Sequence, residues 1–196
     1  MPDFGPFERK MRDAGLPAVA IRAFRHYYDQ LARGATGTLS EEEIEPVSAG
    51  EVPSAEALGP EDREAGAAAL PHTVVIKLNG GLGTSMGMTK AKSLLPVKGE
   101  TTFLDVIARQ TVRLRERTGS VVPLVLMNSF RTREDSLAAL SRHGSLSGPL
   151  PPDFLQHKVP RVRCDDLTPV SWPQEPEHEW CPPGHGDLYT SLLTSG

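Results

Sequence analysis

Two short apolar runs, each followed by a longer stretch of mixed polarity, dominate the pattern of this chain. Residues 73–78 and 121–127 are rich in β-branched and aliphatic side chains, which is typical of buried parallel strands. Residues 103–117 place apolar side chains at helical spacing, and residues 131–142 are expected to form a second helix. The order strand, helix, strand, helix predicts the α/β class, with a doubly wound, Rossmann-like and mostly parallel sheet.

The segment before this pattern is expected to be an N-terminal helical and irregular region, residues 1–70. Within it, residues 16–33 repeat apolar side chains at helical spacing. Residues 34–70 are rich in Ala, Gly, Pro, Glu and Ser, which is typical of irregular surface structure. Inside this irregular part, Ser40 and Glu43 have the spacing of a capping box.

The part of the chain after the second strand is expected to contain short elements joined by loops. Residues 154–163 can form a short strand, and residues 165–183 are rich in Pro and Glu. Residues 188–193 are expected to be helical, with Asp187 most simply as the N-cap of that helix.

Composition limits the partners that the chain can have. Its formal net charge is −4 and its pI is about 5.9, which favours neither nucleic acid nor an anionic membrane as a partner. Any anion must therefore bind at a local site. No signal-peptide pattern and no apolar run of membrane-spanning length is visible, so we expect a cytoplasmic protein. Cys164 and Cys181 are then expected to be free thiols.

The first strand runs into the most informative segment, the sequence K-L-N-G-G-L-G-T-S-M-G-M-T-K-A-K-S at residues 77–93. Glycines allow the backbone to come close to a nucleotide and to turn its N–H groups toward phosphate oxygens. Lysines near the end of the segment add positive charge. Ligands of open α/β sheets bind at the carboxyl ends of strands, which is where this segment is expected to lie.

Two common phosphate-binding loops do not fit this segment. A Walker A loop needs G-x-x-x-x-G-K-[ST], but Lys90 and Lys92 are preceded by Thr89 and Ala91. A dinucleotide fingerprint needs G-x-G-x-x-G, but Met86 stands where its third glycine would be. The failed fingerprint makes a nicotinamide oxidoreductase a remote alternative.

The same segment resembles the nucleotide-binding loop of the UTP–glucose-1-phosphate uridylyltransferase family, the eukaryotic-type UDP-glucose pyrophosphorylases. That family has a loop similar to L-N-G-G-L-G-T-x-M-G-x-x-x-P-K-S, and residues 78–93 match nearly all of it. The clear departure is Ala91, where the family has proline, and we expect it to loosen the loop before Lys92. Met86 stands where pyrophosphorylases for other sugars have an arginine, so the resemblance implies a further phosphate-binding lysine beyond residue 196.

Three later motifs resemble the same family in the same order. They are V-P-L-V-L-M-N-S-F at residues 122–130, Q-H-K-V-P-R at residues 156–161 and W-C-P-P-G-H-G-D at residues 180–187. The resemblance implies that residues 71–196 are the N-terminal part of a nucleotidyltransferase-type, nucleotide-binding domain.

The resemblance also implies roles for eight residues. Gln156 would read the uracil, since its amide offers both a donor and an acceptor to a base edge. Lys92 would stabilise the triphosphate and His185 would meet the sugar 1-phosphate, so these two are the candidate catalytic residues. Gly80 and Gly81 would lie close to both substrates. The implied nucleotide-binding residues are Leu78, Asn79, Gly80, Gly81, Lys92, Gln156 and Gly184.

The implied reaction converts UTP and glucose 1-phosphate into UDP-glucose and pyrophosphate. An oxygen of the sugar phosphate attacks the α-phosphorus of UTP in line, and catalysis consists mostly of positioning and charge neutralisation. Mg²⁺ is expected as a cofactor bound mainly through the phosphates of UTP. The family's metal-binding aspartate is expected beyond Gly196, so we expect no metal ligand in this chain. We further expect that the chain is a fragment with little or no activity alone.

Two alternatives stay open at this point. The first is a uridylyltransferase for another sugar 1-phosphate, since the residues that read the sugar are not among those implied here. The second is a truncated, non-catalytic product that binds UTP.

Overall fold

A three-stranded parallel sheet forms the centre of one half of the molecule. The computed structural model describes residues 2–195, and the strand order is β1 (Val75–Asn79), β4 (Leu124–Asn128) and β5 (Asp153–Leu155). The pairing of β1 with β4 runs in register from Val75 opposite Leu124 to Asn79 opposite Asn128. This confirms the expected α/β class and its parallel sheet. Both of the strands expected from the apolar runs are present, and each begins two or three residues later than expected.

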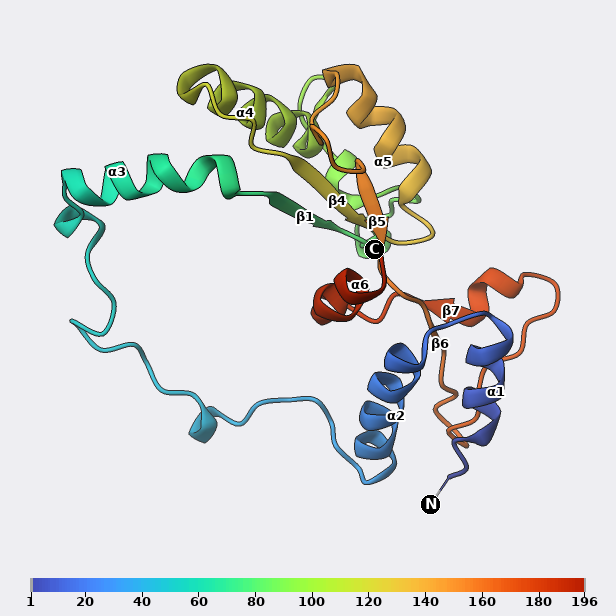
Figure 1. The fold of residues 1–196 in the computed structure, drawn as a ribbon. Coiled ribbons are helices and arrows are strands. Elements are labelled where there is room, and N and C mark those ends of the chain that lie inside the picture. The colour runs from blue at the N-terminus through green and yellow to red at the C-terminus, as the bar shows by residue number, and fades with distance from the viewer. Residues whose placement is uncertain (1, 196) are drawn as a thin grey trace.

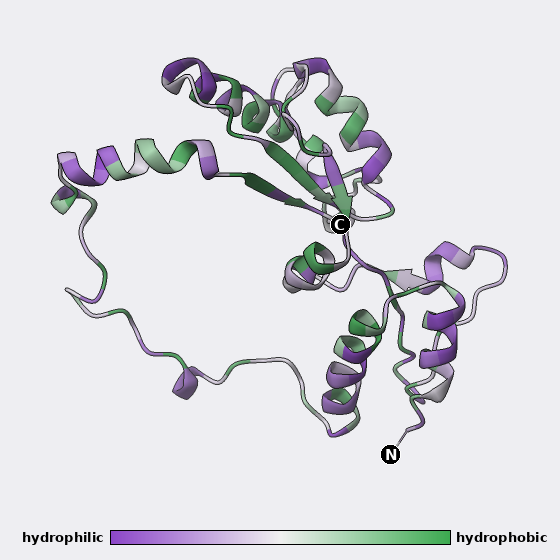
Figure 2. Cartoon of the chain, in the orientation of Figure 1, coloured by the Kyte–Doolittle hydropathy of each residue, from purple (hydrophilic) through white to green (hydrophobic). Residues whose placement is uncertain are grey.

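Two helices connect these strands and pack together on one side of the sheet (Figure 1). They are α4 (Phe103–Thr118) and α5 (Arg133–Leu140), close to the two expected helices. Leu104 and Ala108 of α4 share a core with the alternating Leu124 and Leu126 of β4 and with Leu140 of α5. In Figure 2, β4 and the first part of β1 have the colour of apolar residues, whereas α4 and α5 alternate between apolar and polar residues.

The second half of the molecule is an aromatic core that joins distant parts of the sequence. Helices α1 (Gly5–Asp13) and α2 (Ala18–Ala32) pack against the antiparallel pair β6 (Val159–Pro160) and β7 (Trp180–Cys181). The buried residues of this core are Phe4, Phe7, Met11, Ile21, Tyr28 and Trp180.

Polar contacts reinforce the same junction. The hydroxyl of Tyr28 donates to the carbonyl of Leu167 (3.0 Å), and Lys10 forms an ion pair with Glu179. The expected helix at residues 16–33 is confirmed as α2, whereas α1 was not expected from the sequence. The core contains residues from both sides of the expected boundary after residue 70, and that division of the chain stays a prediction.

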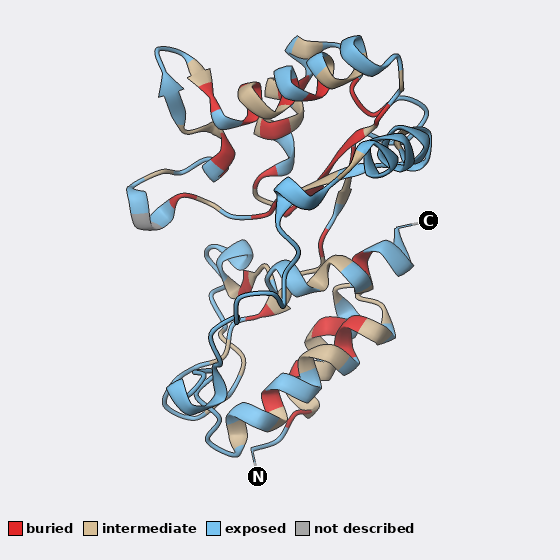
Figure 3. Cartoon of the chain, turned by 90° about the vertical axis from the view of Figure 1, so that its left-hand side faces the viewer, coloured by how far each residue is buried: buried red, intermediate tan, exposed pale blue. Residues whose placement is uncertain are grey.

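A long exposed segment links the two halves (Figures 1 and 3). After α2 the chain forms an open arc with two short 3₁₀ turns, η1 (Glu41–Glu43) and η2 (Ala55–Ala57). The expected capping box is present, because the Ser40 amide donates to the Glu43 carboxylate (2.9 Å). The expectation of irregular structure was wrong for the end of this segment, which forms α3 (Pro60–Ala69). Proline at its start and its alanines favour that helix.

The remaining described elements are short and lie around the carboxyl ends of the strands or in the loops. They are η3 (Leu70–His72), η4 (Thr84–Met86), η5 (Lys92–Leu94), β2 (Pro96–Lys98), β3 (Thr101–Thr102), η6 (Ser141–His143), η7 (Pro176–Glu179), η8 (His185–Asp187) and α6 (Leu188–Thr194). Both cysteines, Cys164 and Cys181, are free thiols as expected. Among residues 2–195, no helix combines the length and apolar character needed to cross a bilayer.

A buried carboxylate, that of Asp105, lies in the first turn of helix α4. Asp105 accepts hydrogen bonds from the amide and hydroxyl of Thr102 (2.8 and 2.7 Å), and His143 Nε2 lies 2.6 Å from it. Burial raises the pKa of Asp105, but the hydrogen bonds from His143 and Thr102 outweigh it and hold the pKa well below its ordinary value of 3.8.

A carboxylate whose pKa is lower in the folded state stabilises the fold above its unfolded pKa and loses that contribution as the pH falls. We therefore predict that the melting temperature falls steeply below about pH 5. Asp105→Asn should cost about 1–3 kcal/mol at neutral pH and should show a shallower fall in acid. Thermal denaturation followed by circular dichroism across this pH range measures how steeply the melting temperature of each protein falls as the pH is lowered. An equally steep fall for the wild type and Asp105→Asn would contradict this prediction.

Candidate functional site

A buried polar network joins the carboxyl ends of β1 and β4 to the first residue of β5. The Asn79 side-chain amide donates to Asn128 Oδ1 on β4 and to Ser136 Oγ on α5, both at 2.7 Å. Ser93 Oγ in turn donates to Asn79 Oδ1 at 2.5 Å. Asn128 continues the network by donating to Asp153 Oδ2 of β5 at 3.1 Å. All five residues are buried, so each of these contacts forms away from water.

Two further contacts complete the network. Arg133 at the start of α5 holds the Asp153 carboxylate with Nε and Nη2, at 2.9 and 3.2 Å. This bidentate pair balances the buried charge of Asp153. The hydroxyl of Thr132 donates to the main-chain carbonyl of Asn79 at 2.7 Å. The point where the glycine-rich loop leaves β1 is therefore fixed from several directions.

The glycine-rich loop folds back on itself after leaving β1. The amide of Lys92 donates to the carbonyl of Gly81 (2.9 Å), and the amide of Gly83 donates to the carbonyl of Lys90 (3.3 Å). These contacts bring the lysine at the end of the loop next to the glycines at its beginning. Ala91 is fully buried at φ −53° and ψ 132°, a conformation that proline also adopts. The expected loosening at Ala91 stays a prediction.

The side chain of Gln156 lies over Gly80. The main-chain amide of Gln156 donates to the Asn128 carbonyl (2.8 Å), which positions the residue at the end of the sheet. A Cβ added to Gly80 would lie 1.7 Å from Gln156 Nε2, so only glycine fits beneath this amide. The residue is 5% exposed, and its Oε1 is buried without a hydrogen-bond partner among the described residues. A buried, unpartnered acceptor is costly unless a ligand satisfies it.

The turn after β7 brings a histidine to the same place. Gly184 has φ +110° and ψ 178°, a conformation that side-chain-bearing residues rarely adopt. His185 follows it at the start of η8 and is exposed. The glycine therefore allows the chain to turn sharply and to present His185 at the surface of the site.

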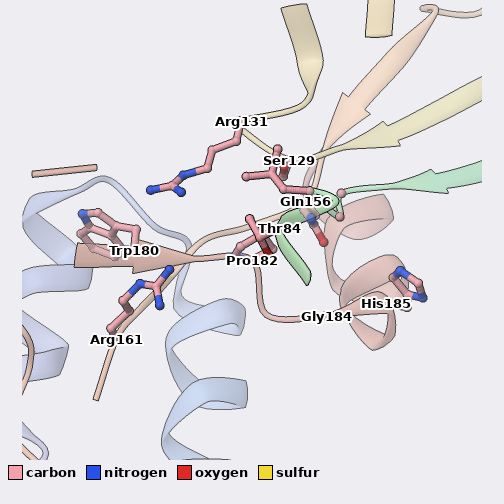
Figure 4. A pocket seen from close by; sticks show the side chains of 12 residues that line it. Thr84, Ser129, Arg131, Gln156, Arg161, Trp180, Pro182, Gly184 and His185 are labelled. Carbon is pink, nitrogen blue, oxygen red and sulfur yellow. The ribbon is translucent and has the colours of Figure 1, made fainter. Parts of the chain in front are cut away.

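The eight residues implied by the sequence line two cavities. The first, of about 270 Å³, is lined by Gly80, Gln156 and Gly184 (Figure 4). The second, of about 490 Å³, is lined by Leu78, Asn79 and Lys92. Two residues, Gly81 and His185, line both cavities. The fold thus brings together residues that lie more than 100 positions apart in the sequence.

The side chain of Asn79 is used differently from the others. Both hydrogens of its amide and its oxygen are engaged in the buried network. Asn79 therefore shapes the base of the loop, and its implied contact with a nucleotide stays a prediction.

The structure also places residues at the cavities that sequence reasoning missed. Lys77 lines the second cavity together with Lys92, and burial lowers the pKa of its ammonium group. Arg131 and Arg161 line the first cavity, and their guanidinium groups lie on the same side of it as Trp180 (Figure 4). A signal was available for the arginines, because each ends or directly follows one of the motifs quoted above. Lys77 opens the glycine-rich segment of residues 77–93, but only the lysines near the end of that segment were considered as cations.

Comparison with known proteins assigns the chain to a family. A family model described as UTP–glucose-1-phosphate uridylyltransferase matches residues 21–196. The enzyme of that name from Pyrus pyrifolia is 44% identical over 138 residues, which are 70% of this chain and 29% of that protein. The Solanum tuberosum enzyme is 41% identical over 128 residues, covering 65% of this chain and 27% of its own length. The chain thus spans less than a third of these relatives.

Solved structures agree with this assignment. UDP-glucose pyrophosphorylase from Leishmania major, a mutant in complex with UDP-glucose, has a TM-score of 0.86 and 38% identity, covering 98% of this chain and 39% of that one. UDP-glucose phosphorylase from Trypanosoma brucei has a TM-score of 0.86 and 37% identity, and the match covers 97% of this chain and 40% of that one. The resemblance inferred from the four motifs is confirmed, and the chain belongs to the UTP–glucose-1-phosphate uridylyltransferase family.

Proposed function

We propose that this chain binds UTP as part of an enzyme that converts UTP and glucose 1-phosphate into UDP-glucose and pyrophosphate. The observation that carries this proposal is the meeting of two chemically different cavities at Gly81 and His185. The Gln156 amide in the first cavity suits a base and Lys92 in the second suits phosphates, so a nucleoside triphosphate can span both. The Leishmania major relative, solved in complex with UDP-glucose, supports the same choice of ligand.

The first cavity has the features that a uracil needs. Uracil presents an N–H donor between two carbonyl acceptors, and the amide of Gln156 offers the complementary acceptor and donor. Its unpartnered Oε1 is available for the N–H of the base. Gly184 leaves room for close approach of the base to the backbone, because no atom lies within 4 Å of the place of its missing side chain, whereas Gly80 leaves room for the Gln156 amide.

The second cavity has the charge that phosphates need. Lys77 and Lys92 are two of its lining residues, and no aspartate or glutamate is among those that the structure places there. His185 lies between this cavity and the base cavity, where it can donate to a phosphate or to the incoming sugar phosphate. Local cations thus provide an anion site on a chain whose net charge is −4.

The proposed mechanism follows from this arrangement. Gln156 and the glycine backbone hold the uridine, and Lys92 neutralises charge on the triphosphate and on the leaving pyrophosphate. His185 orients the sugar phosphate, whose oxygen attacks the α-phosphorus in line. The bond from the α-phosphorus to the bridging oxygen breaks, and no covalent enzyme intermediate is needed.

Mg²⁺ is proposed as a partner of the UTP phosphates. Among residues 2–195, no group of three or more His, Cys, Asp or Glu side chains is placed to hold a metal ion. We assign no step of the mechanism to the ion. The cytoplasmic location expected from the sequence likewise stays a proposal.

The base cavity can be tested with Gly80→Ala. The added methyl group must displace the Gln156 amide, so the preference for UTP·Mg²⁺ over ATP·Mg²⁺ should fall by about tenfold or more. Isothermal titration of the 196-residue chain with both nucleotides measures this preference. A wild-type chain without any preference for UTP would contradict the proposed function.

A double-mutant cycle shows whether Gly80 acts through Gln156. Gln156→Ala should also lower the preference, and Gly80→Ala should then add little, because the displaced amide is already absent. Fully additive losses would show that the glycine has a separate role.

The phosphate cavity can be tested with Lys92→Met and a series of uridine nucleotides. Removing a charge beside the phosphates should lower the affinity for UTP by roughly tenfold, the affinity for UDP by less, and the affinity for UMP hardly at all. Lys90→Met is a matched control, since Lys90 is exposed and pairs at 4.0 Å with Asp135 outside both cavities. Equal losses for UMP and UTP, or equal effects of both variants, would contradict the assignment of Lys92.

A further inference from the structure

A histidine–aspartate pair lines a further cavity of about 550 Å³ together with Gly184 and His185. His157 Nδ1 lies 2.9 Å from Asp187 Oδ1, and the main-chain amide of His157 donates to Asp187 Oδ2 at 2.7 Å. Both side chains are less than 10% exposed. The carboxylate also accepts from the hydroxyls of Thr190 (2.6 Å) and Ser191 (2.7 Å). The imidazole and the carboxylate are thus held together inside the protein.

This finding corrects the expected role of Asp187. The residue does precede α6, but its side chain makes no capping bond to the first main-chain amides of that helix. It binds His157 and two hydroxyls of α6 instead. Burial raises the pKa of Asp187, but the hydrogen bonds from His157, Thr190 and Ser191 outweigh it and lower the pKa, which favours the charged form.

The position of this pair in the sequence links it to both parts of the nucleotide site. His157 directly follows Gln156, and Asp187 lies two residues after His185. Before the turn, residues 180–181 are paired with residues 159–160 in the β6–β7 ladder. After the turn, Asp187 is bonded to His157. The turn at residues 182–186 is therefore held at both ends by the segment that carries Gln156.

We propose that the His157–Asp187 pair is a positioning element that sets uridine specificity. It fixes the distance between the Gln156 amide and the Gly184–His185 backbone, so that the base contacts the amide on one side and this backbone on the other. Neither side chain lines the first cavity, so the pair acts through its chain neighbours. This inference rests on the proposed function, because it concerns how the same site discriminates between bases.

The structure offers a matched control for this pair. His143 and Asp105 form a second histidine–aspartate contact of 2.6 Å, with side chains 16% and 8% exposed. It lies at the start of α4 and lines neither cavity. Removing either imidazole should lower stability to a similar extent, but only His157 should affect the choice of nucleotide.

The experiment compares His157→Ala, His157→Asn and His143→Ala in the 196-residue chain. Affinities for UTP·Mg²⁺ and CTP·Mg²⁺ are measured by isothermal titration, because these ligands differ only at the base edge. Melting temperatures are recorded beside them. We expect His157→Ala to lower the ratio of UTP to CTP affinity by about tenfold. His157→Asn retains an N–H donor for Asp187 and should recover much of the ratio, and His143→Ala should keep the wild-type ratio.

The outcomes separate a failure of this inference alone from a failure of the proposed function. If the wild type prefers UTP and His157→Ala keeps that preference at a lowered melting temperature, the pair is only structural and the inference is overturned. An equal loss of ratio in His143→Ala overturns it as well, since any loss of stability would then suffice. A wild type that does not prefer UTP over CTP overturns both the inference and the proposed function.

Discussion

The contact between Asn79 and Asn128 is the interaction on which the rest of the site depends. The two side chains face each other across neighbouring parallel strands, buried, at the end where each strand gives way to a loop. Buried amides without partners would be costly, so each has been supplied with partners from a different element. Ser93 comes from the returning glycine-rich loop, Ser136 from α5 and Asp153 from β5.

This network separates the support of the site from the site itself. The side chains of the network bond to one another and hold the strand ends and the glycine-rich loop in place. The backbone of the glycines is not part of these side-chain contacts and is free to approach a ligand. Gln156 illustrates the division, because its main chain is anchored to Asn128 while its amide oxygen remains without a partner. Recognition of a base requires a few polar groups that are held rigidly in place, here next to a backbone of glycines that a ligand can approach closely.

Much of this arrangement was predictable from the sequence, because its signals are local. Apolar runs predict β1 and β4, and Gly80, Gln156 and His185 lie in motifs that the fold brings to one cavity. Helix α1 and the aromatic core were missed, because contacts such as Phe7 with Tyr28 and Trp180 depend on packing across the whole chain. The role of Asp187 was misjudged for a similar reason. Its sequence position suggests a cap, but a residue 30 positions away takes its carboxylate.

The central claim is that segments far apart in the sequence form one uridine-binding site. Hydrogen exchange with mass spectrometry tests it directly, by comparing the chain alone, with UTP·Mg²⁺ and with ATP·Mg²⁺. Our account predicts that UTP slows hydrogen exchange both in residues 80–92 and in residues 182–187, and that exchange in α1 and α2 does not change. At equal concentration, UTP should slow exchange in the two segments more than ATP does. Protection of only one of these segments, or equal protection by ATP, would contradict it.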